Sequence, residues 1–250
     1  MPRHVSIPTL TAALLSGALV LGLAGCSRDQ STPTLLAEAR QYQEKGDLKA
    51  ALIQLKNAVA KSPDDANARL QLGTLYLETG DAVSADKELR RAASLGTSAE
   101  QVLPLLARAL QAQGKFKESL DELKPDTVAK SAPLLALRGD ALLATQQPDA
   151  AKEAYQAALA LQPNNGAALI GMARHAVLSG NREEAELYAI AATEKDANNP
   201  DVWNFRGAML RAVNKPDDAL AAYGKVIALR PNDVNARIEQ AYLHINQGKF

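Results

Sequence analysis

Cysteine is almost absent from this sequence, because Cys26 is the single example in 250 residues. A chain with one cysteine forms no internal disulfide, so an oxidising compartment would place no covalent constraint on the fold. Histidine is nearly as scarce, and His175 and His244 stand far apart while His4 lies close to the N-terminus. Because metal sites need clustered ligands, we predict that the chain has no metal site.

An excess of charge of one sign is also lacking, since 28 Lys and Arg residues balance 28 Asp and Glu residues. Binding to nucleic acid requires a basic surface that displaces counterions from phosphate, so we expect no nucleic-acid partner. The same balance gives no reason to expect electrostatic adsorption to anionic lipid. Aromatic residues make up only 4% of a chain that is 47% hydrophobic, which predicts a core filled mainly by alanine and leucine.

Groups that could carry catalysis are missing as well. No serine lies in a strand-turn-helix elbow, and the carboxylates occur in periodic runs such as 181–186, which usually form a solvated helix face. The tripeptide at 138–140 matches a cell-adhesion motif, but Gly139 occupies a small packing position of a predicted helix. We therefore predict no catalytic residues, no cofactor and no enzymatic activity.

The N-terminal segment lacks charged side chains between Val5 and Ser27. Its apolar stretch, residues 10–23, has the length of a signal-peptide core and is shorter than the roughly 20 residues of a membrane-spanning helix. These features predict a signal peptide over residues 1–25.

Cys26 follows this stretch directly, and Leu23, Ala24, Gly25 and Cys26 resemble the bacterial lipobox. The resemblance implies cleavage before Cys26 and attachment of lipid to its thiol, in preference to the alternative of a buried thiol. Two or three acyl chains would hold the protein permanently, whereas one holds it only reversibly. Residues 26–31 would then be a lipidated tether. Ser27 stands where an aspartate would favour retention in the inner membrane, so we expect the periplasmic face of the outer membrane.

A period of 34 residues governs the rest of the chain, because Gly46, Gly80 and Gly114 are each 34 residues apart. Gly180 and Gly248 are separated by two such periods. Each unit predicts two helices with apolar and small residues at helical spacing. A turn with glycine or with Asp and Asn joins the helices, and prolines such as those at 63, 163 and 231 end the second helix.

This pattern resembles the tetratricopeptide repeat from Thr32 onward. The resemblance implies an all-α, right-handed helix-turn-helix solenoid of six repeats and half of a seventh. The predicted repeats are 32–65, 66–99, 100–131, 132–165, 166–199, 200–233 and a partial unit, 234–250. In the third repeat the stretch 124–133 is out of register. Because an array that stops in half a repeat leaves an apolar helix face open, we expect this sequence to be the N-terminal part of a longer protein.

A closer resemblance rests on the lipobox together with the stretches 51–81 and 104–116. These resemble the TPR-repeat lipoproteins of the PEP-CTERM/exosortase systems, which accompany exopolysaccharide gene clusters. The resemblance implies a scaffold linked to exopolysaccharide production or protein sorting. It also leaves open an alternative client, with the chain assisting assembly of a pilus secretin or of outer-membrane proteins. A third hypothesis places an enzymatic domain beyond Phe250.

The family's groove positions, carried over one at a time, give the candidate partner-binding residues. They are Arg40, Gln43, Thr74, Glu78, Arg108, Gln111, Asp140, Arg174, Asn204 and Arg211. The set contains four arginines, and apolar Leu70, Leu77 and Val177 lie among them. This combination suggests a concave groove for an extended, partly acidic peptide. The alternative is a solvated face without a ligand. Arginine replaces the asparagine of the family's carboxylate clamp at 40, 108 and 174, so chaperone-tail binding is not implied. Aromatic residues recur at packing positions, which favours core packing over an aromatic track for sugars; they are Tyr42, Tyr76, Tyr155, Tyr223 and Trp203.

Overall fold

The computed structural model describes residues 30–248, and this part of the chain consists of fourteen α-helices without a β-strand. Residues 31–248 belong to one compact unit. The predicted signal peptide, the lipobox and Cys26 lie outside the described residues, as do residues 249 and 250. Within residues 30–248, none of the helices combines the length and the apolar character needed to cross a membrane.

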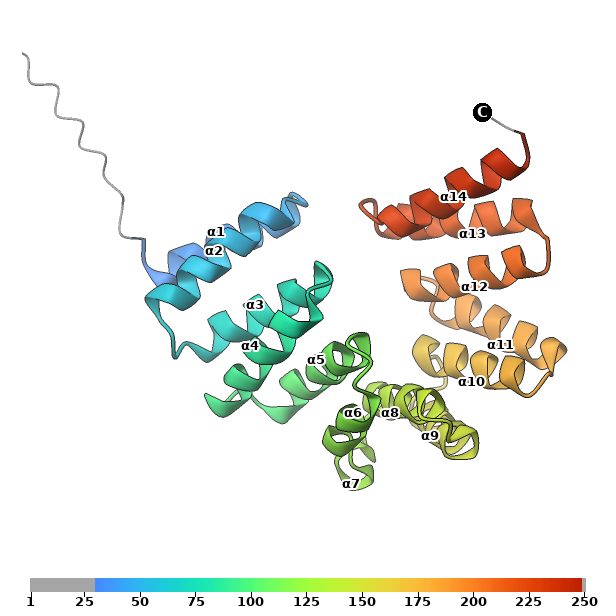
Figure 1. Cartoon of the computed structure of the whole chain (residues 1–250), viewed down its shortest axis with the longest axis horizontal. Coiled ribbons are helices and arrows are strands. Elements are labelled where there is room, and N and C mark those ends of the chain that lie inside the picture. The colour runs from blue at the N-terminus through green and yellow to red at the C-terminus, as the bar shows by residue number, and fades with distance from the viewer. Residues whose placement is uncertain (1–29, 249–250) are drawn as a thin grey trace, which may run out of the picture. The chain divides into compact units, whose positions relative to one another are not determined.

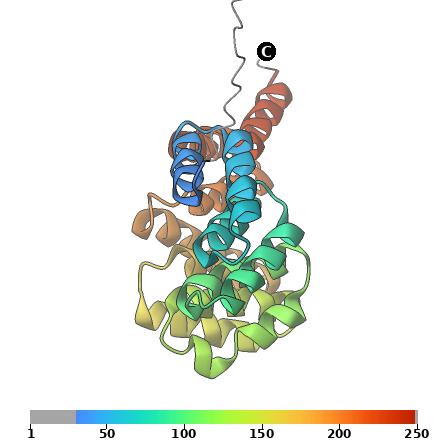
Figure 2. The ribbon, with the colours of Figure 1, turned by 90° about the vertical axis from the view of Figure 1, so that its left-hand side faces the viewer.

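The helices form pairs that follow one another in chain order (Figure 1). The first helices are α1 (Thr32–Glu44), α3 (Ala66–Glu78), α5 (Ala99–Ala112), α8 (Ala132–Ala144), α10 (Gly166–Leu178), α12 (Pro200–Ala212) and α14 (Val234–Asn246). The second helices are α2 (Leu48–Lys61), α4 (Ala82–Ser94), α6 (Phe116–Glu122) with α7 (Pro125–Val128), α9 (Pro148–Leu161), α11 (Arg182–Lys195) and α13 (Pro216–Leu229). Partners within a pair lie side by side, as α1 and α2 do in Figure 2. The prediction of an all-α solenoid is confirmed.

The turn within a pair closes one helix and caps the next. In the first repeat, Gly46 has φ of +74°, the left-handed conformation that ends many helices, and its N–H donates to the carbonyl of Gln43. Asp47 then caps α2, because its carboxylate accepts a hydrogen bond from the backbone N–H of Ala50 at 3.0 Å. Gln146 and Asn214 take the left-handed position in the fourth and sixth repeats.

Small residues on the first helices let the second helices approach closely. A Cβ atom added to Gly207 would lie 2.9 Å from the ring of Tyr223, and one added to Gly73 would lie 2.8 Å from Leu89. Gly139 lies under the ring of Tyr155 in the same way, so the tripeptide at 138–140 is part of the packing. A side chain added at one of these glycines would collide with the paired residue, so that residue or the helices would have to shift.

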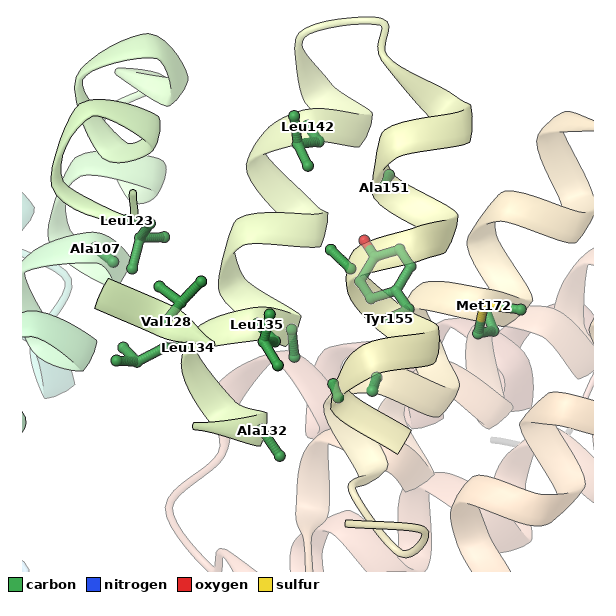
Figure 3. Packing of buried hydrophobic residues seen from close by; sticks show 14 of the residues in the cluster. Ala107, Leu123, Val128, Ala132, Leu134, Leu135, Leu142, Ala151, Tyr155 and Met172 are labelled. Atoms are coloured by element: carbon green, nitrogen blue, oxygen red, sulfur yellow. The ribbon is translucent and has the colours of Figure 1, made fainter. Parts of the chain in front are cut away.

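Tyr42, Tyr76, Tyr155, Tyr223 and Trp203 pack on the core clusters, as the sequence pattern favours. Tyr155 and Tyr223 are almost fully buried. Figure 3 shows the Tyr155 ring beside α8 and α9, with Met172 of α10 nearby. Tyr42 and Tyr76 are partly buried against the cores of the first repeats. The indole N–H of Trp203 donates to the carbonyl of Ala197 at 2.7 Å.

The third repeat departs from the regular pair, at the stretch that the sequence places out of register. Its second helix is interrupted before Pro125, where Lys124 adopts an extended conformation, and a second short helix, α7, follows. Leu123 and Val128, on either side of the break, are fully buried and lie close to Ala107 and Leu134 (Figure 3). Arg138 of α8 donates to the carbonyl of Leu123 at 2.6 Å, which satisfies an acceptor at the helix end.

Candidate functional site

The predicted groove residues all lie on first helices, from α1 to α12. Those that are exposed are Arg40, Glu78, Arg108, Arg174, Asn204 and Arg211. The remaining four, Gln43, Thr74, Gln111 and Asp140, are half-buried.

Two of the half-buried residues are engaged in holding the fold together. Gln111 donates to the backbone carbonyl of Leu137 at 2.8 Å and to the hydroxyl of Ser119 at 3.1 Å, so it links the third and fourth repeats. The hydroxyl of Thr74 donates to the carbonyl of Leu70 within the same helix. Leu70 and Leu77, predicted as apolar groove residues, pack against the core of the second and third repeats.

Asp140 and Arg174 come together at the junction of the fourth and fifth repeats. Arg174 donates to a carboxylate oxygen of Asp140 at 3.3 Å, and the hydroxyl of Tyr155 donates to the same oxygen at 2.8 Å. The Asp140 side chain is 26% exposed, and its burial raises the pKa of the carboxyl, an effect that the charge of Arg174 opposes. Burial and the neighbouring carboxylate also raise the pKa of the Tyr155 hydroxyl.

Arg174 extends this junction to the sixth repeat. Its guanidinium lies 5.6 Å from the centre of the Phe205 ring, within the range of a cation–π interaction. The side chain is half exposed, so it lies at the surface between an anion on α8 and an aromatic ring on α12.

An apolar hollow of about 730 Å³ opens beside Arg174, between α10, α11 and α12; we call it the fifth-repeat hollow. Its apolar walls are formed by Leu143, Val177, Leu178, Phe205, Met209 and Val213. Charged side chains at its edge are Arg174, Arg182, Glu183, Glu186 and Arg206. The volume falls within the roughly 300–1,000 Å³ of typical ligand pockets.

A smaller hollow of about 420 Å³ adjoins it on the side of the third repeat. Gln111, Phe116 and Asp140 line the smaller hollow, and Leu143, Arg174 and Leu178 line both. Three predicted residues, Gln111, Asp140 and Arg174, are therefore brought together here. Val177, predicted as an apolar groove residue, lines the fifth-repeat hollow. The other predicted groove residues line neither hollow, and Arg211 instead pairs with Glu239 at 3.3 Å.

Sequence reasoning missed the side of the fifth-repeat hollow that α12 supplies, namely Phe205, Arg206 and Met209. A usable signal was present, because phenylalanine occurs only three times in the sequence and Phe205 is followed directly by an arginine. Among residues 30–248, no cluster of three or more His, Cys, Asp or Glu side chains has an arrangement suited to a metal ion. The arrangement that is present, an apolar hollow edged with charge, is suited to binding.

The comparison with family profiles identifies the repeat. A profile described as the tetratricopeptide repeat matches residues 42–103 and 142–209, which together make up slightly more than half of the chain. A second tetratricopeptide repeat profile matches residues 206–250.

One curated relative is the cellulose synthase 1 operon protein C of Komagataeibacter xylinus, which is 27% identical over 227 residues. This alignment covers 83% of the chain and 17% of the relative, so the chain spans less than a fifth of that protein's length. Among solved structures, a tetratricopeptide repeat protein from Parabacteroides merdae is similar with a TM-score of 0.57, 20% identity and 88% of each chain covered. The type IV pilus biogenesis factor PilW is similar with a TM-score of 0.58 and 18% identity, covering 83% of this chain and 97% of PilW. At these identities the two structures show a shared fold.

Proposed function

Because the chain belongs to the tetratricopeptide repeat family, we propose that it is a non-enzymatic scaffold that binds other proteins through the first helices of its repeats. The observation that carries this proposal is the combination of exposed arginines on first helices with an apolar hollow in the same array. Arg40 and Arg108 are exposed and have no ion pair among residues 30–248. Arginine is enriched among the residues that dominate protein interfaces.

The proposal places this scaffold in the bacterial envelope, attached by lipid on Cys26 to the periplasmic face of the outer membrane. Support comes from the lipobox-like sequence at 23–26. Membrane contact would be made through the lipid alone, because the described residues include no membrane-spanning helix.

Exopolysaccharide machinery is the proposed client of the scaffold. The support is the resemblance to the TPR-repeat lipoproteins of the PEP-CTERM/exosortase systems and the distant relative from a cellulose synthase operon. Assistance to pilus secretin or outer-membrane protein assembly is the second candidate. It is favoured only by the fold shared with PilW.

The anchor is tested by the Cys26→Ser variant, expressed in the source bacterium and followed by membrane fractionation. We expect the variant to leave the membrane fraction, because removal of the thiol removes the site of lipidation. The circular dichroism of the repeats should be unchanged. A Cys26→Ser protein that still sediments with the outer membrane would refute the anchor.

The scaffold is tested by cross-linking in living cells, capture of the protein and mass spectrometry of what is bound. Arg108→Glu is the informative variant, because Arg108 is exposed and its reversal disturbs no ion pair, whereas Arg174 neutralises Asp140. Lys87→Glu is the matched control, since Lys87 is exposed on the second helix α4 and undergoes the same change of charge.

Recovery of polysaccharide-export or exosortase-system proteins, lost in Arg108→Glu and kept in Lys87→Glu, is the expected result. If pilus or barrel-assembly proteins are recovered instead, and are also lost in Arg108→Glu and kept in Lys87→Glu, the scaffold function stands but its partner is the second candidate. Partners that bind Arg108→Glu as well as they bind the wild type would contradict binding through the first helices.

A further inference from the structure

One register position separates the fifth repeat from the other five. In each repeat, a small residue of the first helix is followed sixteen positions later by a buried residue of the second helix. The five regular pairs are Ala39 with Leu55, Gly73 with Leu89, Ala107 with Leu123, Gly139 with Tyr155, and Gly207 with Tyr223. In the fifth repeat the pair is Ala173 with Ala189, so the large side chain is absent.

The fifth-repeat hollow lies where this large side chain is absent. Ala189 is buried at its floor together with Ala185 and Leu210. The other five repeats have leucine or tyrosine at this position. These side chains are 0–1% exposed, so they fill the corresponding space from within. The protein interior normally leaves few voids larger than a water molecule. The fifth repeat thus has room for a large side chain that it does not itself supply.

Apolar surface around the hollow is left exposed to solvent. Val177 and Leu178, at the end of α10, are 50% and 69% exposed, and Val213, directly after α12, is 55% exposed. Single exposed hydrophobic residues are ordinary, but these three line one hollow. Their arrangement is typical of a surface that is covered by another molecule.

The charges at the edge of the hollow favour an acidic occupant. Arg174 is paired with Asp140, and Glu186 is paired with Lys215 at 3.8 Å. Arg182 and Arg206 have no ion pair within residues 30–248, and neither does Glu183, which leaves the edge with a net positive charge. A guanidinium without a partner binds carboxylates strongly and can do so in a bidentate manner.

We propose that the fifth-repeat hollow receives one leucine- to tyrosine-sized side chain of a partner protein, from a segment that carries an Asp or Glu within a few residues. The inserted side chain takes the place of the large residue missing at Ala189. The neighbouring carboxylate pairs with Arg206 or Arg182. This inference rests on the proposed scaffold function and assigns its anchoring site.

The decisive variant is Ala189→Leu, which places a larger side chain at the floor of the hollow and occupies the space proposed for the inserted side chain. Leucine is compatible with alanine at the paired position, because Leu55 packs with Ala39 and Leu123 packs with Ala107 in the first and third repeats. We therefore expect Ala189→Leu to fold with a midpoint of thermal unfolding at or above that of the wild type. Ala157→Leu is the matched control, because Ala157 is exposed on the second helix α9.

Random peptides displayed on phage, selected on the immobilised full chain, provide the probe. We expect the enriched peptides to share one large apolar residue with an acidic residue a few positions away. Their affinity, measured by fluorescence anisotropy, should fall about tenfold or more in Ala189→Leu and stay unchanged in Ala157→Leu. Arg206→Gln should weaken binding of the acidic peptides but leave binding of their Asn or Gln counterparts unchanged.

A second variant covers the case in which Ala189→Leu fails to fold. Val177→Ser combined with Leu178→Ser changes only exposed side chains, and we expect the same loss of peptide affinity. Peptides that bind both variants as tightly as the wild type would overturn the inference, as would enrichment of peptides without an acidic residue. If the protein is a dimer that Ala189→Leu dissociates, the occupant of the hollow is a second copy of the chain and the inference is overturned. If Ala189→Leu displaces bound fatty acid, the occupant is a lipid and the inference is likewise overturned.

The result also separates this inference from the scaffold function. If peptide affinity falls in Arg108→Glu but is unchanged in Ala189→Leu, the scaffold function stands and the hollow is not its anchoring site. A selection that enriches no peptide at all would contradict both.

Discussion

The third and fifth repeats both depart from the regular unit, and they differ in how the resulting space is filled. The third repeat loses half of its second helix at Pro125, yet Leu123 and Val128 fold inward and are fully buried. In the fifth repeat, α11 has its full length of 14 residues, but Ala189 lies at the floor of a hollow of about 730 Å³. An interrupted backbone is thus compatible with a filled core, and an intact helix with an open one.

This difference shows that a continuous second helix does not by itself close a repeat, and it points to the side chain at the buried register position as a contributor. Arg138 completes the closure of the third repeat by binding the carbonyl of Leu123. The corresponding link between the fourth and fifth repeats joins two side chains, Arg174 and Asp140, at the surface. Variants that exchange these properties test the comparison.

The largest expected effect comes from Leu123→Ala, which gives the third repeat the gap that the fifth already has. Removal of a fully buried leucine creates a cavity, so the free energy of unfolding should fall by about 2–5 kcal/mol. Urea unfolding followed by circular dichroism measures the change. Leu187→Ala is the control, since Leu187 is 67% exposed on α11 and its loss should change stability by about 0.5 kcal/mol or less. Equal effects of the two substitutions would mean that the third repeat collapses around the gap.

A smaller loss is expected from Arg138→Met, which keeps much of the apolar stem and removes the donor to the Leu123 carbonyl. A buried acceptor without its donor destabilises a protein by about 1–3 kcal/mol. The same urea experiment measures this, with Arg91→Met as control because the ion pair of Arg91 with Asp64 is exposed. If Arg138→Met is no more destabilising than Arg91→Met, the carbonyl is satisfied by solvent.

The smallest effect concerns the pH dependence at Asp140. Burial raises the pKa of this carboxyl in the folded state above its unfolded value of about 3.9, so folding favours the protonated form. The stability contributed by the protonated form is present below pH about 3.9 and is lost as pH rises through the folded pKa. Relative to Asp140→Asn, the wild type should therefore become less stable on going from acid to neutral pH. A difference that is constant with pH would show that Arg174 compensates the burial completely.

Much of the fold could be predicted from the sequence, because the signals are local. The 34-residue period, the glycine at the turn and the aspartate caps act within a few residues, and the structure has helices where these signals indicate them. The irregular third repeat also has a local signal in Pro125, which disfavours a helical conformation for the residue before it.

The candidate site was less accessible, because it depends on which side chains meet across repeats. The family pattern places Gln111 in a groove, but its amide reaches the carbonyl of Leu137, 26 residues away. Asp140 and Arg174 were both predicted as groove residues. Their ion pair, and the contact of Arg174 with the Phe205 ring, depend on how α8, α10 and α12 are placed. Ala189 is visible in the sequence. That it replaces a buried leucine or tyrosine becomes clear only when the repeats are aligned by the buried pair of residues that each contains.

The sixteen-residue separation within each buried pair has a consequence for how the chain folds. Loop-closure entropy depends on the number of residues between two contacting groups, and here that number is short and is the same in every repeat. Contacts of such low order form quickly and do not wait for distant parts of the chain. Folding of such an array can therefore begin at any repeat and propagate to its neighbours, instead of depending on one pair of distant segments.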